Sequence, residues 1–240
     1  MHPRCDDPAQ FAQQVEQVCA LYAQAKSLRD GGVHVLSCDE MSGIQALERA
    51  APSLPLQPGH VERREFEYIR HGTLSLIANF EVATGRIVTP TLGPSRTEED
   101  FVAHVRQSIA SDPAAEWVFI TDNLNTHQSE GLVRLVAVEC GLNVELGEKG
   151  KCGILATLQS RAAFLGAQSH RVRFVYTPKH CSWLNQIEIW FSILVRRLLR
   201  RASFACIAEL ALRILEFIAY FNRTMARAFK WTYAGRPLVV

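Results

Sequence analysis

The spacing of apolar residues predicts a chain that begins with a helix and continues with three strands. Apolar side chains at positions 11, 15, 18, 19, 22 and 25 fall on one face of a helix over about 8–29. The β-branched run 33–40 predicts the first strand. Residues 73–83 and 85–92 predict two more strands, joined in a hairpin at Thr84-Gly85.

Helices and strands alternate in the rest of the chain. Three acidic residues after Thr97 predict the start of a helix. Further elements are predicted at 117–123 (strand), 129–140 (helix), 171–176 (strand), about 184–201 (helix) and about 205–222 (helix). This order favours an α/β fold of the ribonuclease-H-like type, a mixed sheet flanked by helices. The competitor is an open doubly wound sheet, whose strands would normally be separated by helices from the start.

The length favours one domain with appendages over two equal domains, because 240 residues suffice for a single large core. We interpret residues 1–30 as a helical lead-in and residues 31–240 as one domain. About 141–170 holds four glycines and a short helix near 159–161, and we interpret this segment as an insertion.

Composition points to a protein of the cytoplasm. The apolar runs are interrupted by Arg or Glu before they reach the roughly 18 residues of a membrane span, and the first 30 residues do not have the pattern of a signal sequence. We therefore expect no membrane partner. Seven cysteines without a CxxC pair favour reduced thiols over a disulfide framework or a zinc site.

Charge is distributed unevenly along the chain. From Arg171 onwards there are 12 basic against 3 acidic residues, whereas the net charge of the whole chain is only +2. A basic end of this kind suits a polyanion such as DNA. A solvated basic helix face is the alternative, and charge alone would favour it.

Three acids are candidates for a metal site. Asp39 and Asp122 stand at the predicted ends of strands, and Glu188 lies in the first turns of the helix that follows the last strand. Such positions meet at one end of a sheet. Converging carboxylates repel one another unless a cation neutralises them, and hard oxygen ligands favour Mg²⁺ or Mn²⁺. Two such ions would suit cleavage of a phosphodiester.

Each acid also has a simpler interpretation. Asp122 suits a turn at a strand end, Asp39 a helix N-cap, and Glu188 an exposed helix position. Glu40 adds an ambiguity, because neighbouring residues of a strand point to opposite faces and only one of Asp39 and Glu40 faces the metal easily.

Several motifs resemble those of a known family. They are CDE (38–40), GIQALERA (43–50), EYIRHGTLSLIANF (67–80), TDNLNTH (121–127), TPKHCSWLNQIEIWF (177–191) and FNRTMARAFKWTYAGRPL (221–238). Together they resemble the catalytic domain of the insertion-sequence 630 transposases, in the larger Tc1/mariner group, from about Val33 to Leu238. The most specific signals are DN followed by H and WLNQIE followed by WF.

The resemblance implies a DDE transposase with Asp39, Asp122 and Glu188 as its catalytic acids and ligands of two Mg²⁺ or Mn²⁺ ions. The resemblance also identifies Asp39, and not Glu40, as the first of these acids. It implies metal-dependent cleavage at transposon ends and strand transfer into target DNA, a cut-and-paste reaction commonly at a TA dinucleotide. Transposition needs paired ends, so a homodimer is expected in the active complex.

Neighbouring polar residues are weaker candidates. Asn123 and His127 are expected to orient Asp122, to contact a phosphate, or simply to satisfy a turn. His180 and Asn185 are expected to position or cap the Glu188 helix. Four arginines follow that helix and are candidates for DNA phosphates: Arg196, Arg197, Arg200 and Arg201.

Two features depart from the family pattern. The interval from Asp122 to Glu188 is longer than the commonest one, and the 141–170 segment accounts for the surplus. Related transposases usually begin with paired helix-turn-helix domains, but about 30 residues precede the first strand here, so we expect that segment to be fused or encoded separately. A catalytically silent DNA-binding or dimerising fragment is therefore the alternative function. A cellular ribonuclease H or junction resolvase fits the fold but not the WLNQIE and KWTYAGRPL blocks.

Overall fold

Five strands form one mixed sheet in the computed structural model, which describes residues 8–51, 57–61 and 66–233. The strands are β1 (Val33–Arg49), β2 (Tyr68–Glu81), β3 (Arg86–Gly93), β4 (Glu116–Thr121) and β5 (Val172–Tyr176). Their order across the sheet is β3-β2-β1-β4-β5. The first three strands pair antiparallel, whereas β1–β4 and β4–β5 pair parallel. The predicted mixed sheet with a leading hairpin is thus confirmed.

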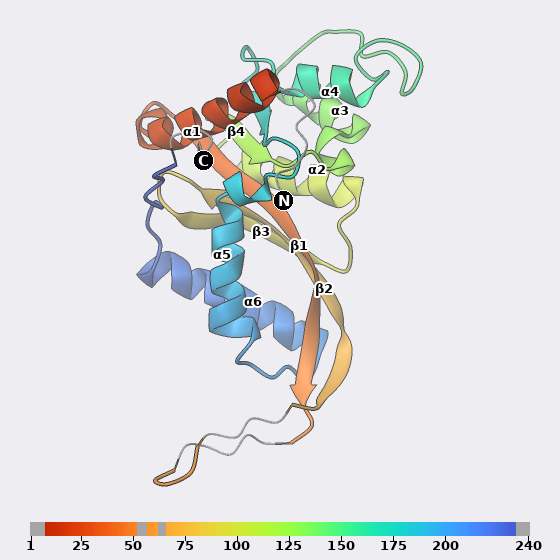
Figure 1. The fold of residues 1–240 in the computed structure, drawn as a ribbon. Coiled ribbons are helices and arrows are strands. Elements are labelled where there is room, and N and C mark those ends of the chain that lie inside the picture. Colours follow the sequence, from red (N-terminus) through yellow and green to blue (C-terminus); the bar gives the residue numbers. More distant parts are fainter. Residues whose placement is uncertain (1–7, 52–56, 62–65, 234–240) are drawn as a thin grey trace.

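Helices cover both faces of the sheet (Figure 1). One face packs against α1 (Pro8–Asp30), α5 (Ile187–Leu194) and α6 (Ile207–Thr224). The other packs against α2 (Glu98–Ser111), α3 (Glu130–Glu139) and α4 (Leu158–Leu165). Because both faces of the central strands are buried, β4 has a nearly continuous apolar sequence, WVFI, and not a simple alternation.

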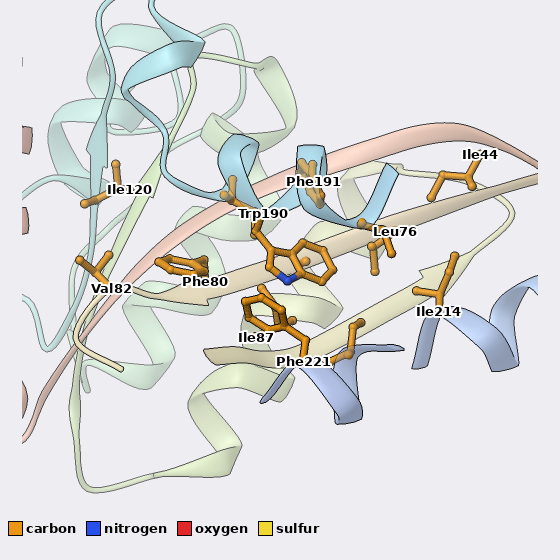
Figure 2. Packing of buried hydrophobic residues seen from close by; sticks show 14 of the residues in the cluster. Ile44, Leu76, Phe80, Val82, Ile87, Ile120, Trp190, Phe191, Ile214 and Phe221 are labelled. Atoms are coloured by element: carbon orange, nitrogen blue, oxygen red, sulfur yellow. The ribbon is translucent and has the colours of Figure 1, made fainter. Parts of the chain in front are cut away.

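Aromatic residues dock α5 onto the sheet. Trp190 and Phe191 are buried and lie with Phe80 of β2 and Phe221 of α6 in one cluster (Figure 2). The Trp190 and Phe221 rings meet edge to face with centroids 6.1 Å apart. Full burial of one such aromatic or aliphatic side chain is worth about 1.5–3 kcal/mol, so this packing fixes the helix that carries Glu188.

β1 and β2 are both longer than the sequence predicted, and β2 begins at Tyr68 and not at residue 73. β1 does not end at residue 40 but runs on to Arg49, paired with β2 beyond the other strands (Figure 1). Register shifts between Met41 and Ile44 interrupt the pairing, and Gly43 there has a φ of +67°. The bulge breaks the alternation that would have signalled a longer strand.

The predicted helix at 184–201 is three pieces. A 3₁₀ turn, η2 (Ser182–Leu184), precedes α5, and a π-helical turn, η3 (Val195–Leu199), follows it. Apolar spacing does not distinguish these helix types in pieces this short, because each piece covers only about one turn.

Among the described residues, the helices are too short or too polar to cross a membrane. Among the described cysteines, five are free thiols: Cys19, Cys38, Cys140, Cys152 and Cys206. Cys5 lies outside the described residues.

An asparagine closes the exposed edge of β3. The Nδ2 amide of Asn222 on α6 donates to the Ile87 carbonyl at 2.7 Å, and its Oδ1 accepts from the Ile87 N–H at 2.8 Å. Both backbone groups of Ile87 would otherwise lack partners next to the core, since the Ile87 residue is buried.

We expect Asn222→Ala to lower the free energy of unfolding by about 1–3 kcal/mol, because it leaves two backbone groups unpaired. Urea unfolding measures this change, with Asn143→Ala at an exposed position as the control. Equal stability of the two variants would contradict the role of Asn222.

Candidate active site

The register of the parallel strands brings two acids together. β1 and β4 pair with Ser37 opposite Ile120. Continued by two residues, this register sets Asp39 beside Asp122, on the same face of the sheet. Asp122 follows directly after β4, at its carboxyl end. The third acid, Glu188, lies in the first turn of α5, the helix packed on that face.

Electrostatic coupling shows that the acids are neighbours. The charge of Asp122 contributes to raising the pKa of both Asp39 and Glu188. Asp39 and Glu188 therefore both lie close enough to Asp122 for its charge to affect them.

Asp39 is the most buried of the three, with 9 % of its surface exposed. Burial raises its pKa to about 7, and the charges of Asp122 and Glu40 act in the same direction. The Glu40 N–H donates to Asp39 Oδ1 at 2.8 Å and opposes this shift. Glu188 is exposed, but its partial desolvation also raises its pKa, followed by the effect of Asp122. Both acids resist ionisation in the absence of a further cation.

Asp122 behaves in the opposite way. Partial burial alone would raise its pKa, but hydrogen bonds from His127 and from the Leu124 N–H outweigh burial, so the pKa is lowered. The Leu124 N–H lies 2.9 Å from Oδ1, and the His127 Nδ1 atom lies 2.8 Å from the same oxygen. Asp122 is therefore held as a carboxylate.

Glu40 has a role that the sequence did not indicate. It faces the opposite side of the sheet from Asp39, and its side chain is 1 % exposed. Its Oε1 lies 3.0 Å from His127 Nε2, while its Oε2 is buried without a partner. His127 thus bridges two carboxylates, Glu40 and Asp122. Strand alternation separates Asp39 from Glu40 but does not reveal the histidine, 87 positions away, that Glu40 meets.

The 141–170 segment braces the turn that carries His127. This turn is a 3₁₀ helix, η1 (Asn125–Gln128). The buried Arg161 guanidinium donates to the Gln128 carbonyl at 2.7 Å and to the Leu155 carbonyl at 2.9 Å. The Tyr176 hydroxyl donates to the His127 carbonyl at 2.9 Å. The segment therefore contributes to the core beneath the site.

Two hollows flank the acids. One, of about 400 Å³, is lined by Asp122, Asn123, Lys179 and His180, among others. The Asn123 amide donates to the Thr177 carbonyl, so it fixes the wall of this hollow and does not bond to the Asp122 side chain. His180 is exposed with a φ of +63°.

The second hollow, of about 290 Å³, lies beside Glu188. Its apolar floor includes Met41 and Phe191, and its basic wall is formed by Arg196 and Arg200. All four predicted arginines are exposed, but Arg197 and Arg201 do not line this hollow. The last candidate, Asn185, is fully buried and points at Asp39, with Nδ2 at 3.3 Å from Oδ2.

The donor atoms fit a hard divalent cation, because they are carboxylate oxygens and two of the three acids have raised pKa values. The acid side chains are spread apart and do not enclose a cation position. Across residues 8–51, 57–61 and 66–233, no three His, Cys, Asp or Glu side chains already form a compact set of metal ligands. A cation would draw the acids closer than their mutual repulsion permits.

The fold and the family agree with this site. The sheet and its helices form the ribonuclease-H-like fold of transposase catalytic domains. Residues 34–211 match the family model described as DDE superfamily endonuclease, so the chain belongs to this family.

Similar solved structures come from the Mos1 mariner transposase. Its catalytic domain has a TM-score of 0.50 with 9 % identity, covering 91 % of this chain and 85 % of that chain. Its paired end complex with Mn has a TM-score of 0.53 with 11 % identity over 91 % of this chain. A pre-cleavage Mos1 transpososome has a TM-score of 0.52 with 11 % identity. The chain spans 57 % of the Mos1 chain in the paired end complex. Comparison with curated protein sequences gives no match.

The bridging histidine should make stability depend on pH. Burial would lower the pKa of His127, but its hydrogen bonds to Asp122 and Glu40 outweigh burial and raise the pKa to about 10. The stability from this charge is complete below about pH 6.5, the ordinary pKa of histidine, and is lost as pH rises towards 10.

We therefore expect the difference in free energy of unfolding between the native chain and His127→Asn to shrink between about pH 6.5 and pH 10. Urea unfolding at a series of pH values tests this, with the exposed His60→Asn as a control. Parallel curves for the native chain and His127→Asn would show that the imidazole carries no extra charge in the fold.

Proposed function

We propose that the chain is the catalytic domain of a DDE transposase of the insertion-sequence 630 type, in the Tc1/mariner group. The observation that carries the proposal is the β1–β4 register, which by continuation would bring Asp39 beside Asp122 on the sheet face that packs against α5, the helix of Glu188. Membership of the DDE superfamily endonucleases supports the same assignment of the three acids.

Asp39, Asp122 and Glu188 would hold two Mg²⁺ or Mn²⁺ ions. Mos1 catalytic-domain structures are named as containing Mn in one case and Mg in another, both with raltegravir. Bound there, the ions would activate a water or a 3′-hydroxyl and stabilise the leaving oxygen of a phosphodiester. The raised pKa values of Asp39 and Glu188 support this assignment, since a cation would favour their ionised forms.

Other residues of the chain would orient the acids and the DNA. His127, held by Glu40, keeps Asp122 ionised and fixes its carboxylate. Arg196 and Arg200 on one side and Lys179 and His180 on the other line the two flanking hollows. The charges of Arg196, Arg200 and Lys179 would attract phosphates on either side of the reacting bond.

In this proposal the substrates are transposon ends and target DNA, with cut-and-paste transfer at a TA dinucleotide. Mos1 structures named as a paired end complex and a transpososome support a homodimer as the active assembly. A helix-turn-helix segment, fused or separately encoded, would supply recognition of the ends. The second candidate is a catalytically silent DNA-binding fragment, which the open arrangement of the acids within the described residues favours.

We expect Asp122→Asn and Glu188→Gln each to weaken Mn²⁺ binding and Mn²⁺-dependent nicking of supercoiled plasmid by more than about 100-fold, because each removes a proposed ligand. Calorimetry and gel analysis measure the two effects. Glu216→Gln, an exposed acid on α6 paired with Arg213, is the matched control and should behave like the native chain.

The outcomes separate the two candidates. Mn²⁺ binding that depends on these acids, with nicking, supports the enzyme. If the chain binds Mn²⁺ but does not nick DNA, recovery of nicking after fusion of an upstream helix-turn-helix segment also supports the enzyme. Equally weak binding by all variants would favour the silent fragment.

The arginines of the Glu188 hollow should contribute to DNA affinity. We expect Arg196→Gln and Arg200→Gln each to weaken binding of a DNA duplex and to reduce the slope of log Kd against log salt by about 1, because each removes one phosphate contact. Fluorescence anisotropy at several salt concentrations tests this. Arg134→Gln, on α3 at the other face, should leave affinity and slope unchanged.

A further inference from the structure

A buried polar cluster holds the start of the helix that carries Glu188. We call Tyr22, Ser37 and Asn185 the α5 anchor. Tyr22 comes from α1, Ser37 from β1 two residues before Asp39, and Asn185 from the turn three residues before Glu188. Ser37 and Asn185 are fully buried and Tyr22 is nearly so. Three distant parts of the chain therefore meet at this point.

Asn185 connects the two acids directly. Its Nδ2 amide donates to the Cys38 carbonyl at 3.0 Å and to Asp39 Oδ2 at 3.3 Å, and its Oδ1 accepts from the Ser37 hydroxyl. Its backbone carbonyl accepts from the Glu188 N–H at 3.1 Å. One residue thus bonds to the side chain of Asp39 and to the backbone of Glu188.

The two hydroxyls hold the backbone on either side of Asn185. The Tyr22 hydroxyl donates to the Leu184 carbonyl at 2.7 Å and accepts from the Gln186 N–H at 3.4 Å. The Ile187 N–H donates to Ser37 Oγ at 2.8 Å. Residues 184–187 are each bound by the anchor.

The anchor replaces the usual helix cap. A helix start leaves backbone N–H groups without partners, and a side chain at the N-cap normally accepts from one of them. The N-cap of α5 is Gln186, whose side chain makes no such bond. Ser37 supplies the acceptor from the neighbouring strand instead, so the start of α5 is positioned by the sheet and α1.

We infer that Tyr22, Ser37 and Asn185 are positioning residues that fix Glu188 relative to Asp39, and that α1 thereby takes part in setting the geometry of the carboxylate site. This inference rests on the proposed function. The anchor ends on the two acids themselves, and a small displacement of a ligand weakens a metal site strongly. A shift of α1 would move the Leu184 carbonyl and, four residues later, Glu188.

The experiment compares Mn²⁺ affinity with stability in variants that remove one group each. Tyr22→Phe and Ser37→Ala delete a hydroxyl, and Asn185→Ala deletes the amide. Tyr220→Phe removes an exposed hydroxyl from α6 and is the matched control. Calorimetry with Mn²⁺ alone is performed well below the unfolding midpoint of every variant, and the midpoints are measured separately.

We expect Tyr22→Phe and Ser37→Ala to weaken Mn²⁺ binding by about two- to tenfold, the effect of one hydrogen bond, and Asn185→Ala to weaken it more. Tyr220→Phe should bind as the native chain does. A merely structural anchor would lower the unfolding midpoint and leave the Mn²⁺ affinity of the folded protein unchanged.

Two results would overturn the inference in distinguishable ways. If both hydroxyl variants bind Mn²⁺ like the native chain while Glu188→Gln does not, the site is real but the anchor does not position it. If Glu188→Gln also binds normally, the proposed function fails and the inference falls with it. Should Asn185→Ala not fold, the two hydroxyl variants decide the question.

Discussion

The parallel pairing of β1 with β4 is the constraint on which the site depends. It places Ser37 opposite Ile120, and so brings Asp39 and Asp122 to the same level and face. A slip of one residue would turn Asp39 towards the face covered by α2 and α3. It would also move the neighbouring apolar side chains of β1 to the opposite faces of the sheet. Val35 and Leu36 of β1, packed into opposite clusters, hold the register because each face is buried.

The electrostatics of the site follow from this pairing. Acids brought together resist ionisation, and buried Asp39 and partly desolvated Glu188 both have raised pKa values. The pKa of Asp122 is lowered instead, because His127 contacts it from the other layer of the protein, where Glu40 binds the imidazole. The negative charge of Asp122 is therefore balanced within the fold by His127, whereas Asp39 and Glu188 have no such partner among the described residues and would be stabilised as carboxylates by the cation of the proposed function.

The sequence predicted those features that local pattern or motif determines. The order of strands and helices follows from apolar spacing, and Asp39, Asp122 and Glu188 were candidates from their places at element ends. Ser37 and Tyr22 were missed because an ordinary serine in a strand and an ordinary tyrosine on a helix face carry no signal. Their partners lie roughly 150 or more positions away, and only the folded chain reveals them. The same holds for Glu40, whose partner is on another layer.

The two halves of the site are fixed by different physical means. Asp39 lies in β1 and Asp122 follows directly after β4, two strands whose ladder and two apolar faces leave little freedom. Glu188 depends on aromatic docking by Trp190 and Phe191 and on polar contacts to Asn185, Ser37 and, through α1, Tyr22. The Trp231 ring packs against Tyr22 at 4.9 Å and its Nε1 donates to Cys19, so the segment after α6 also bears on α1. A rearrangement of these outer elements would therefore alter the position of Glu188 while the two aspartates stay in place.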